Sequence, residues 1–151
     1  MVKATILVQR AFGFSFLAFG LNGFVHFISH SHVGLHNGAL EFFLGLAATG
    51  YMLPLLYMTQ AAAGACLLVG FYVPLALAVL APVVINILLF HIFLAPAGIP
   101  LALMLVSFEV SLAWSYRHAF APMLQPHTIP DQAEPAPAES KVAAPARPAI
   151  A

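Results

Sequence analysis

The sequence predicts an all-α membrane protein: a polytopic four-helix bundle with a short interfacial half-helix between its first and second spans. Of the 151 residues, 62% are hydrophobic and 7% are charged, whereas a soluble domain is about half apolar and about a quarter charged. Four apolar stretches reach the length of about 20 residues that a helix needs to cross a hydrocarbon core of about 30 Å. The formal net charge is zero, and no basic block occurs, which excludes nucleic acid as a partner.

Breaker residues set the ends of the four predicted spans. Pro54, Pro74 and Pro100 lie in the first turns of the later spans, where the missing N–H does no harm, and Gly70 ends the second span. The first span ends where serine and histidine residues make the chain polar. The predicted spans are residues 5–28, 52–70, 74–95 and 99–118.

Two further segments complete the predicted organisation. Residues 38–50 are apolar around Glu41 but too short to cross a bilayer, and they predict an interfacial or re-entrant half-helix. Residues 1–123 therefore form the transmembrane domain. Residues 124–151 are rich in proline and alanine with few large apolar residues, and this composition predicts a disordered tail.

The positions of lysine and arginine predict the orientation. Lys3, Arg10 and Arg117 all lie on the side of the two termini, and the loops on the other side contain neither lysine nor arginine. Positive residues near span ends favour the cytoplasm, so both termini and the tail are predicted to be cytoplasmic. The same orientation places three aromatic residues in a belt at the inner interface: Tyr72, Trp114 and Tyr116.

Polar side chains within the spans are the candidate ligand-binding residues, because a central charge costs about 2.5–3.5 kcal/mol on insertion scales. Counting the helical rise predicts an inner layer of Arg10, Gln60, Asn86 and Glu109, and an outer layer of Asn22, His26 and His91. Arg10 and Glu109 are the only opposite charges within the spans. They could form a proton-relay, anion or quinone site, or a structural pair that fixes the helix register. Gln60 and Asn86 could join helices or bind a ligand.

Histidines dominate the outer layer. His26 and His30 are four residues apart, and with Glu41 and His91 they could supply three nitrogens and one carboxylate to a divalent metal. The same histidines could ligate haem, hydrogen bond to a quinone carbonyl, or lie at polar interfaces without a ligand. Asn86 and His91 are about 140° apart around a helix, so we expect them to face different neighbours.

Small residues in the first two spans allow close approach of neighbouring helices. They are Gly13, Gly20 and Gly23 in the first span and Ala61, Gly64 and Ala65 in the second. The single cysteine, Cys66, excludes a disulfide framework and cysteine-based metal clusters.

Several segments resemble the DoxX-like family of small four-helix membrane proteins. They are Arg10 with the small and aromatic residues up to Gly20, residues 49–54 (TGYMLP), residues 67–77 (LLVGFYVPLAL) and residues 80–87 (LAPVVINI). The resemblance covers roughly residues 5–120 and implies an inner-membrane four-helix bundle. It also implies relatives linked to quinone reduction during thiosulfate oxidation, and others linked to redox-stress complexes that contain superoxide dismutase. Arg10 matches the helix-one arginine of the family. Members often carry an acidic residue where this chain has Gln60. Any role of a carboxylate at that position therefore cannot be transferred to this chain.

Together these features predict a redox- or quinone-associated subunit of a complex in the bacterial inner membrane. The chain has no Walker loop, nucleophile elbow or CxxC motif, so no activity of the chain alone is predicted, and electrons would have to come from a partner or a bound haem. The alternative is a non-enzymatic accessory or assembly subunit that packs on other membrane proteins or on itself. A small-solute permease is a third hypothesis, although four helices leave little room for alternating access.

Overall fold

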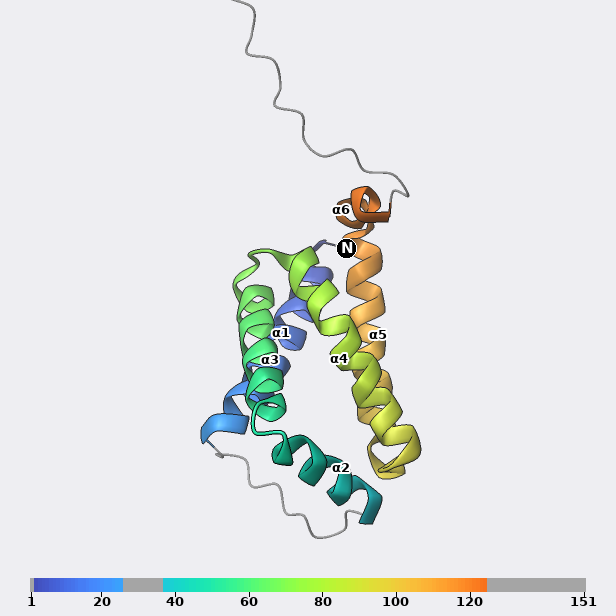
Figure 1. Ribbon diagram of the computed structural model, residues 1–151. Coiled ribbons are helices and arrows are strands. Elements are labelled where there is room, and N and C mark those ends of the chain that lie inside the picture. The colour runs from blue at the N-terminus through green and yellow to red at the C-terminus, as the bar shows by residue number, and fades with distance from the viewer. Residues whose placement is uncertain (1, 26–36, 125–151) are drawn as a thin grey trace, which may run out of the picture.

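The computed structural model describes residues 2–25 and 37–124, and their regular structure is entirely helical (Figure 1). The helices are α1 (Val2–Val25), α2 (Asn37–Ala48), α3 (Met52–Val69), α4 (Val73–Phe93), α5 (Ile99–Ser115) and α6 (Arg117–Phe120), with 3-10 turns at Pro96–Gly98 and Ala121–Leu124. Four of them, α1, α3, α4 and α5 with the turn before it, are long and apolar enough to cross a membrane. The predicted all-α membrane bundle is confirmed.

Each predicted span overlaps one of these four helices, and α1 and α4 begin three residues and one residue before their predicted spans. Gly70 is the C-cap of α3, and proline occupies one of the first two positions of both α4 and α5. The apolar helix α2 is shorter than a span. Residues 26–28 of the first predicted span, and all of the predicted tail beyond residue 124, lie outside the described residues.

The most extensive packing in the bundle joins α1 to α3. A Cβ atom on Gly13 would lie 2.7 Å from the backbone nitrogen of Leu68, and one on Gly20 would meet the backbone of Ala61. A Cβ on Gly64 would collide with the backbone of Leu17. Such contacts matter because lipid offers no hydrophobic force between spans, so close van der Waals packing joins them. The small residues expected to allow close helix approach therefore bring α1 and α3 together.

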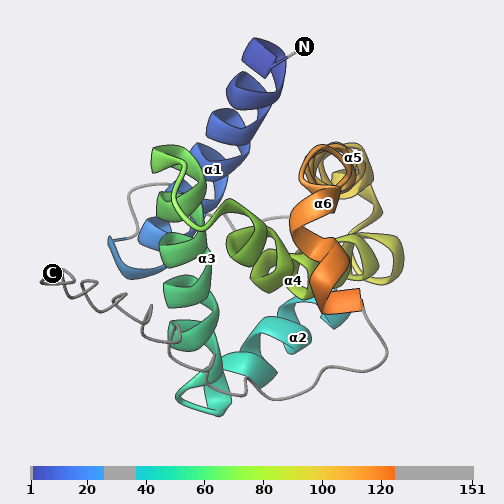
Figure 2. The ribbon, with the colours of Figure 1, turned by 90° about the horizontal axis from the view of Figure 1, so that it is seen from above.

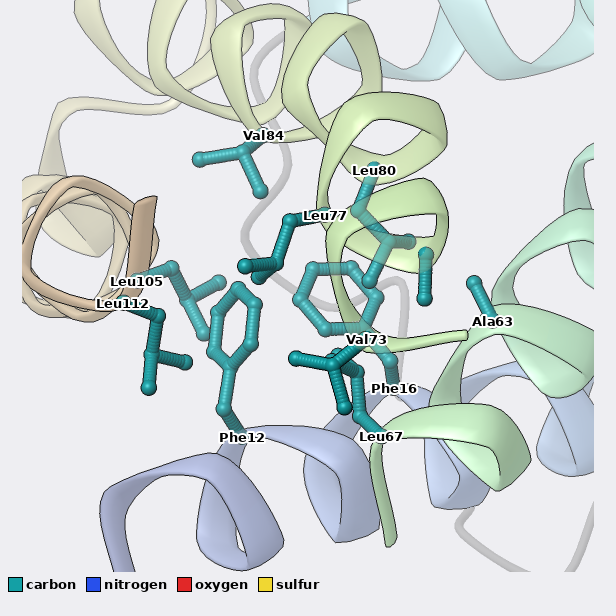
Figure 3. Close-up of a cluster of buried hydrophobic side chains, with 11 residues drawn as sticks. Phe12, Phe16, Ala63, Leu67, Val73, Leu77, Leu80, Val84, Leu105 and Leu112 are labelled. Atoms are coloured by element: carbon teal, nitrogen blue, oxygen red, sulfur yellow. The ribbon is translucent and has the colours of Figure 1, made fainter. Parts of the chain in front are cut away.

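The buried core lies between these two helices and the pair α4 and α5 (Figure 3). Figure 2 shows α4 between α3 and α5. Phe12 is fully buried and packs edge-on against Phe16 at 4.9 Å and Phe108 at 6.3 Å between ring centroids. Leucines and valines from the other helices surround these rings: Leu67, Leu77, Leu80, Val84, Leu105 and Leu112.

The outer surface is that of a protein in lipid. Large apolar side chains are exposed along every long helix, including Phe14, Met58, Leu75 and Val110. The hydroxyls of Thr59 and Ser107 donate to the carbonyls of Leu55 and Leu103, one turn earlier, both at 2.8 Å. These back-bonds satisfy polar groups that hydrocarbon could not.

A three-residue turn, residues 70–72, joins α3 to α4. Gly70 has a φ of 92° and Tyr72 a φ of 51°, so both lie in the left-handed region. The N–H groups of Gly70 and Phe71 donate to the carbonyl of Cys66 at 2.9 and 3.0 Å. This geometry satisfies a helix-terminal carbonyl and reverses the chain within three residues.

Helix α2 lies at the end of the molecule opposite the N-terminus (Figure 1). Two of its aromatic rings pack on Phe90 in the last turns of α4. The centroid distances from Phe90 are 5.4 Å to Phe42 and 5.3 Å to Phe43. This aromatic cluster fixes the short helix beside the C-terminal end of α4.

Candidate ligand-binding sites in the bundle

Glu109 lies on the buried face of α5, which it shares with Ala102, Leu105 and Leu112. The residue is 8% exposed. Its Oε2 atom is completely buried and has no hydrogen-bond partner among the described residues. An unpaired buried acceptor costs about 1–3 kcal/mol, and more when it is charged. Glu109 is therefore the least satisfied polar group in the described core.

Arg10 does not satisfy Glu109. Its side chain is exposed on the outer face of α1, whereas the neighbouring Gln9 and Phe12 are buried. The predicted ion pair between Arg10 and Glu109 is therefore absent from the part of the chain that the structure describes. The prediction was wrong because helical rise gives the depth of a residue but not its face, and Arg10 is about 100° around the helix from Gln9.

Gln9 is a polar residue of α1 that enters the bundle, and the sequence analysis missed it. It is 4% exposed. Its Nε2 donates to the carbonyl of Leu67 at 2.7 Å, and its Oε1 accepts from the hydroxyl of Tyr116 at 2.6 Å. One side chain thus joins α1 to the last turn of α3 and to the C-cap of α5. The spacing of Gln9, Phe12 and Phe16 on one helix face is the signal that could have identified it.

Tyr116 therefore differs from the other two aromatic residues predicted in the belt. Its hydroxyl donates into the bundle, whereas Tyr72 and Trp114 are 73% and 71% exposed. Arg117 extends over Trp114, with its guanidinium carbon 5.5 Å from the ring, and its Nη1 donates to the Trp114 carbonyl at 3.1 Å. Tyr116, Trp114 and Arg117 all lie at the end of the molecule where α3 and α5 end.

Gln60 and Asn22 are both buried, at 7% and 2% exposure. Gln60 shares the inner face of α3 with Ala63, Gly64 and Leu67. The structure does not place Gln60 with Asn86, which is exposed on α4. The predicted inner layer is thus divided between a buried Glu109, a buried Gln60 and two outward residues, Arg10 and Asn86.

His91 is held by its own helix end. Its Nδ1 lies 3.0 Å from the carbonyl of Ala95, and because a carbonyl only accepts, Nδ1 carries the hydrogen. The ring packs edge-on against Phe90 at 5.3 Å and lies so close to Gly98 that a Cβ there would overlap it. The His91 side chain therefore closes the α4 C-terminus, and its Nε2 alone remains for a ligand.

This packing makes Gly98 testable. Gly98→Ala should displace the His91 ring and cost its hydrogen bond to Ala95, a loss of about 1 kcal/mol. The double variant Gly98→Ala, His91→Ala should be no less stable than His91→Ala alone. Thermal unfolding of the three purified variants in one detergent checks both expectations. A Gly98→Ala protein as stable as the parent would show that the contact between the His91 ring and Gly98 does not contribute to stability.

The predicted metal set is not assembled among the described residues. They contain no group of three or more His, Cys, Asp or Glu residues that could hold a metal ion. Glu41 is exposed on α2. His26 and His30, two of the predicted ligands for a metal or haem, lie outside the described residues, so the complete set stays a prediction.

Asn86 lines an open groove of about 220 Å³ between α2 and α4. The other lining residues are apolar and mostly aromatic: Phe42, Leu89, Phe90, Phe93 and Leu94. His91 is not among them, and its ring lies against Ala95 and Gly98 instead. No ionisable group lines the groove. Its chemistry is therefore that of binding: aromatic faces for a flat apolar ring and one carboxamide for a hydrogen bond.

No family model matches the chain, and neither a curated protein nor a solved structure does so.

Proposed function

We propose that this chain is a small multi-pass membrane subunit that binds a quinone, or a related lipid-soluble carbonyl compound, on behalf of a redox partner. The proposal includes membership of the DoxX-like family and an inner-membrane location in bacteria with both termini in the cytoplasm. The observation that carries it is the exposed carboxamide of Asn86 within an aromatic groove.

The depth of Asn86 in the membrane determines which partners its carboxamide can have. Asn86 precedes the end of α4, Phe93, by seven residues, a rise of about 10 Å along the helix. In a bilayer that depth lies within the hydrocarbon, where no water can satisfy the amide. A ligand carbonyl that accepts from Nδ2 would offset this cost. The carboxamide therefore favours an oxygen-bearing ligand over a plain acyl chain.

The size and lining of the groove suit a quinone head group. Rings from Phe42, Phe90 and Phe93 line it, and such rings favour stacked or edge-on contact with another flat ring. The volume of about 220 Å³ is below the range of about 300–1,000 Å³ for drug-sized ligands. The groove would hold one ring, and an isoprenoid tail would remain in the bilayer.

The chain would bind the quinone but would not reduce it unaided. The only cysteine, Cys66, is half-buried in α3, and a single thiol cannot cycle as a dithiol. Electrons would come from a partner that carries a redox centre. Such a division of labour agrees with the redox complexes that the DoxX-like resemblance implies.

Asn86→Leu tests this proposal. The substitution keeps the size of the side chain and removes its hydrogen bond, so we expect binding of a short-tailed ubiquinone to weaken about tenfold, equivalent to about 1.4 kcal/mol. The full chain in detergent micelles is titrated with the quinone, and retained quinone is measured after separation. Ser107→Ala is the matched control, because its exposed hydroxyl already donates to Leu103.

Two results would contradict the proposal: a parent chain that retains no quinone, or an Asn86→Leu chain that binds as tightly as the parent. Phe90→Leu provides a second variant. It removes a ring that both lines the groove and packs on α2, so binding should weaken again. Thermal unfolding of each variant separates lost affinity from lost folding.

An accessory subunit that packs on a second copy is the alternative, and one feature of α5 favours it. Ser107, Ser111 and Ser115 are all exposed and recur every four residues. Small residues at this spacing let membrane helices approach closely. If the serine face meets another helix, Ser111→Leu lowers the molecular mass measured by light scattering and leaves quinone retention unchanged.

A further inference from the structure

The outward face of α1 carries two cations in line. Lys3 and Arg10 are both exposed, and seven residues separate them, about 20° short of two full helical turns. Leu7, Phe14 and Leu21 continue the same stripe, with exposures of 71%, 64% and 44%. We call these five residues the cationic stripe. Its other three residues are apolar, as expected for a surface that faces lipid.

Neither cation has a counter-ion within the described residues. Those residues contain two carboxylates, Glu41 and Glu109. Glu109 is buried on α5, and Glu41 belongs to α2 at the opposite end of the molecule (Figure 1). The third described arginine or lysine, Arg117, lies over the Trp114 ring. The cationic stripe therefore presents two unneutralised charges to its surroundings.

We propose that Lys3 and Arg10 bind the phosphodiester head group of an anionic phospholipid. Arg10 lies about 10 Å deeper along α1 than Lys3, and a long cationic side chain at this depth extends toward the interface. The guanidinium and the ammonium can then reach one head group from two levels. A guanidinium donates two parallel hydrogen bonds to phosphate oxygens.

The surrounding stripe favours a lipid over other anions. Leu7 lies between the two cations along the helix, and Phe14 continues the stripe one turn beyond Arg10. An acyl chain would cover these side chains while the head group meets the charges. The groove at Asn86 lies between α2 and α4, so this lipid site is separate from the proposed quinone site and does not depend on it.

The test measures lipid affinity of the full chain. Native mass spectrometry of the protein in neutral detergent follows titration with phosphatidylglycerol and, separately, with phosphatidylcholine. Each cation near anionic lipid contributes about fivefold in affinity, so Arg10→Gln and Lys3→Gln should each weaken phosphatidylglycerol binding about fivefold, and the double variant about 25-fold. Phosphatidylcholine carries the same phosphodiester, but its choline cancels the net charge, so it should bind the parent more weakly and lose less affinity in the variants. Arg10→Lys should retain most of the affinity.

Arg117→Gln is the matched control, because it removes one cation from the same end of the molecule without touching the cationic stripe. Equal phosphatidylglycerol affinity of the parent and the double variant would overturn the proposal. Displacement of the lipid by inorganic phosphate alone would also overturn it, since the site would then recognise a free anion. A third result would overturn the proposal: an Arg10→Gln chain that keeps its lipid affinity but loses a co-purifying protein. The cationic stripe would then be a protein interface.

Discussion

Replacing Gly64 by alanine is expected to lower the free energy of unfolding by about 2–3 kcal/mol, although alanine is the strongest helix former. The added Cβ would meet the backbone of Leu17 and the carbonyl oxygen of Gly13, the latter at 2.7 Å. Backbone atoms cannot rotate away as a flexible side chain does. Helices α1 and α3 would have to separate along their whole contact, which loses packing that lipid does not replace.

Gly45 supplies the matched control, because a Cβ there would have no atom within 4 Å. Gly45→Ala should be neutral or should stabilise the chain by up to about 1 kcal/mol through helix propensity. Reversible unfolding in mixed detergent micelles, followed by circular dichroism, measures both variants. If the two substitutions change stability in the same direction and by the same amount, the close contact of α1 with α3 does not hold the bundle together.

Gln9→Leu is expected to cost about 3 kcal/mol. The substitution preserves the volume of the side chain but leaves the Leu67 carbonyl and the Tyr116 hydroxyl without partners. A buried group left without a partner costs about 1–3 kcal/mol, and the half-buried Tyr116 hydroxyl costs less than the buried Leu67 carbonyl. The loss should be larger than for a surface polar residue because three helices share this one side chain.

Tyr116→Phe separates the two bonds. It removes only the hydroxyl that donates to Gln9 Oε1, so we expect a loss of about 1 kcal/mol. In a double-mutant cycle, the pair should lose less than the sum of the single variants, because both report the same hydrogen bond. Strict additivity would show that Gln9 and Tyr116 do not interact, and a neutral Gln9→Leu would show that the polar contact is replaced.

Hydropathy and helix-breaking residues were sufficient to predict the helices. Pro74 and Gly70 mark helix ends whatever the tertiary structure, because one lacks a backbone N–H and the other adopts a positive φ at no steric cost. The sequence also identified Gly13 and Gly64 as residues that allow close approach, since small residues let two membrane helices touch, but it did not identify the helix that each one meets. These features depend on local geometry, which the sequence specifies directly.

The faces of the helices were not predictable in the same way. In a soluble helix, polar residues mark the outside, but α1 is apolar toward both lipid and protein, so periodicity hardly separates Phe14 from Phe16. For that reason Arg10 was assigned to the interior and Gln9 was missed. Asn86 was predicted as a candidate, but its groove also needs Phe42 from α2. The position of α2 depends on tertiary contacts that no local pattern encodes.

The packing of α1 on α3 has a consequence for biosynthesis. Helix α1 leaves the ribosome well before α3, because α2 is synthesised between them. Until then the face of α1 that carries Gly13 and Gly20 borders lipid or the insertion machinery and has no helix to pack against. Helices α3 and α4 differ, because the turn of residues 70–72 is too short for one to insert far from the other. We therefore expect α3 and α4 to enter the membrane together as a hairpin. The bundle would begin to assemble when α3 of this hairpin packs against α1, which is already in the membrane.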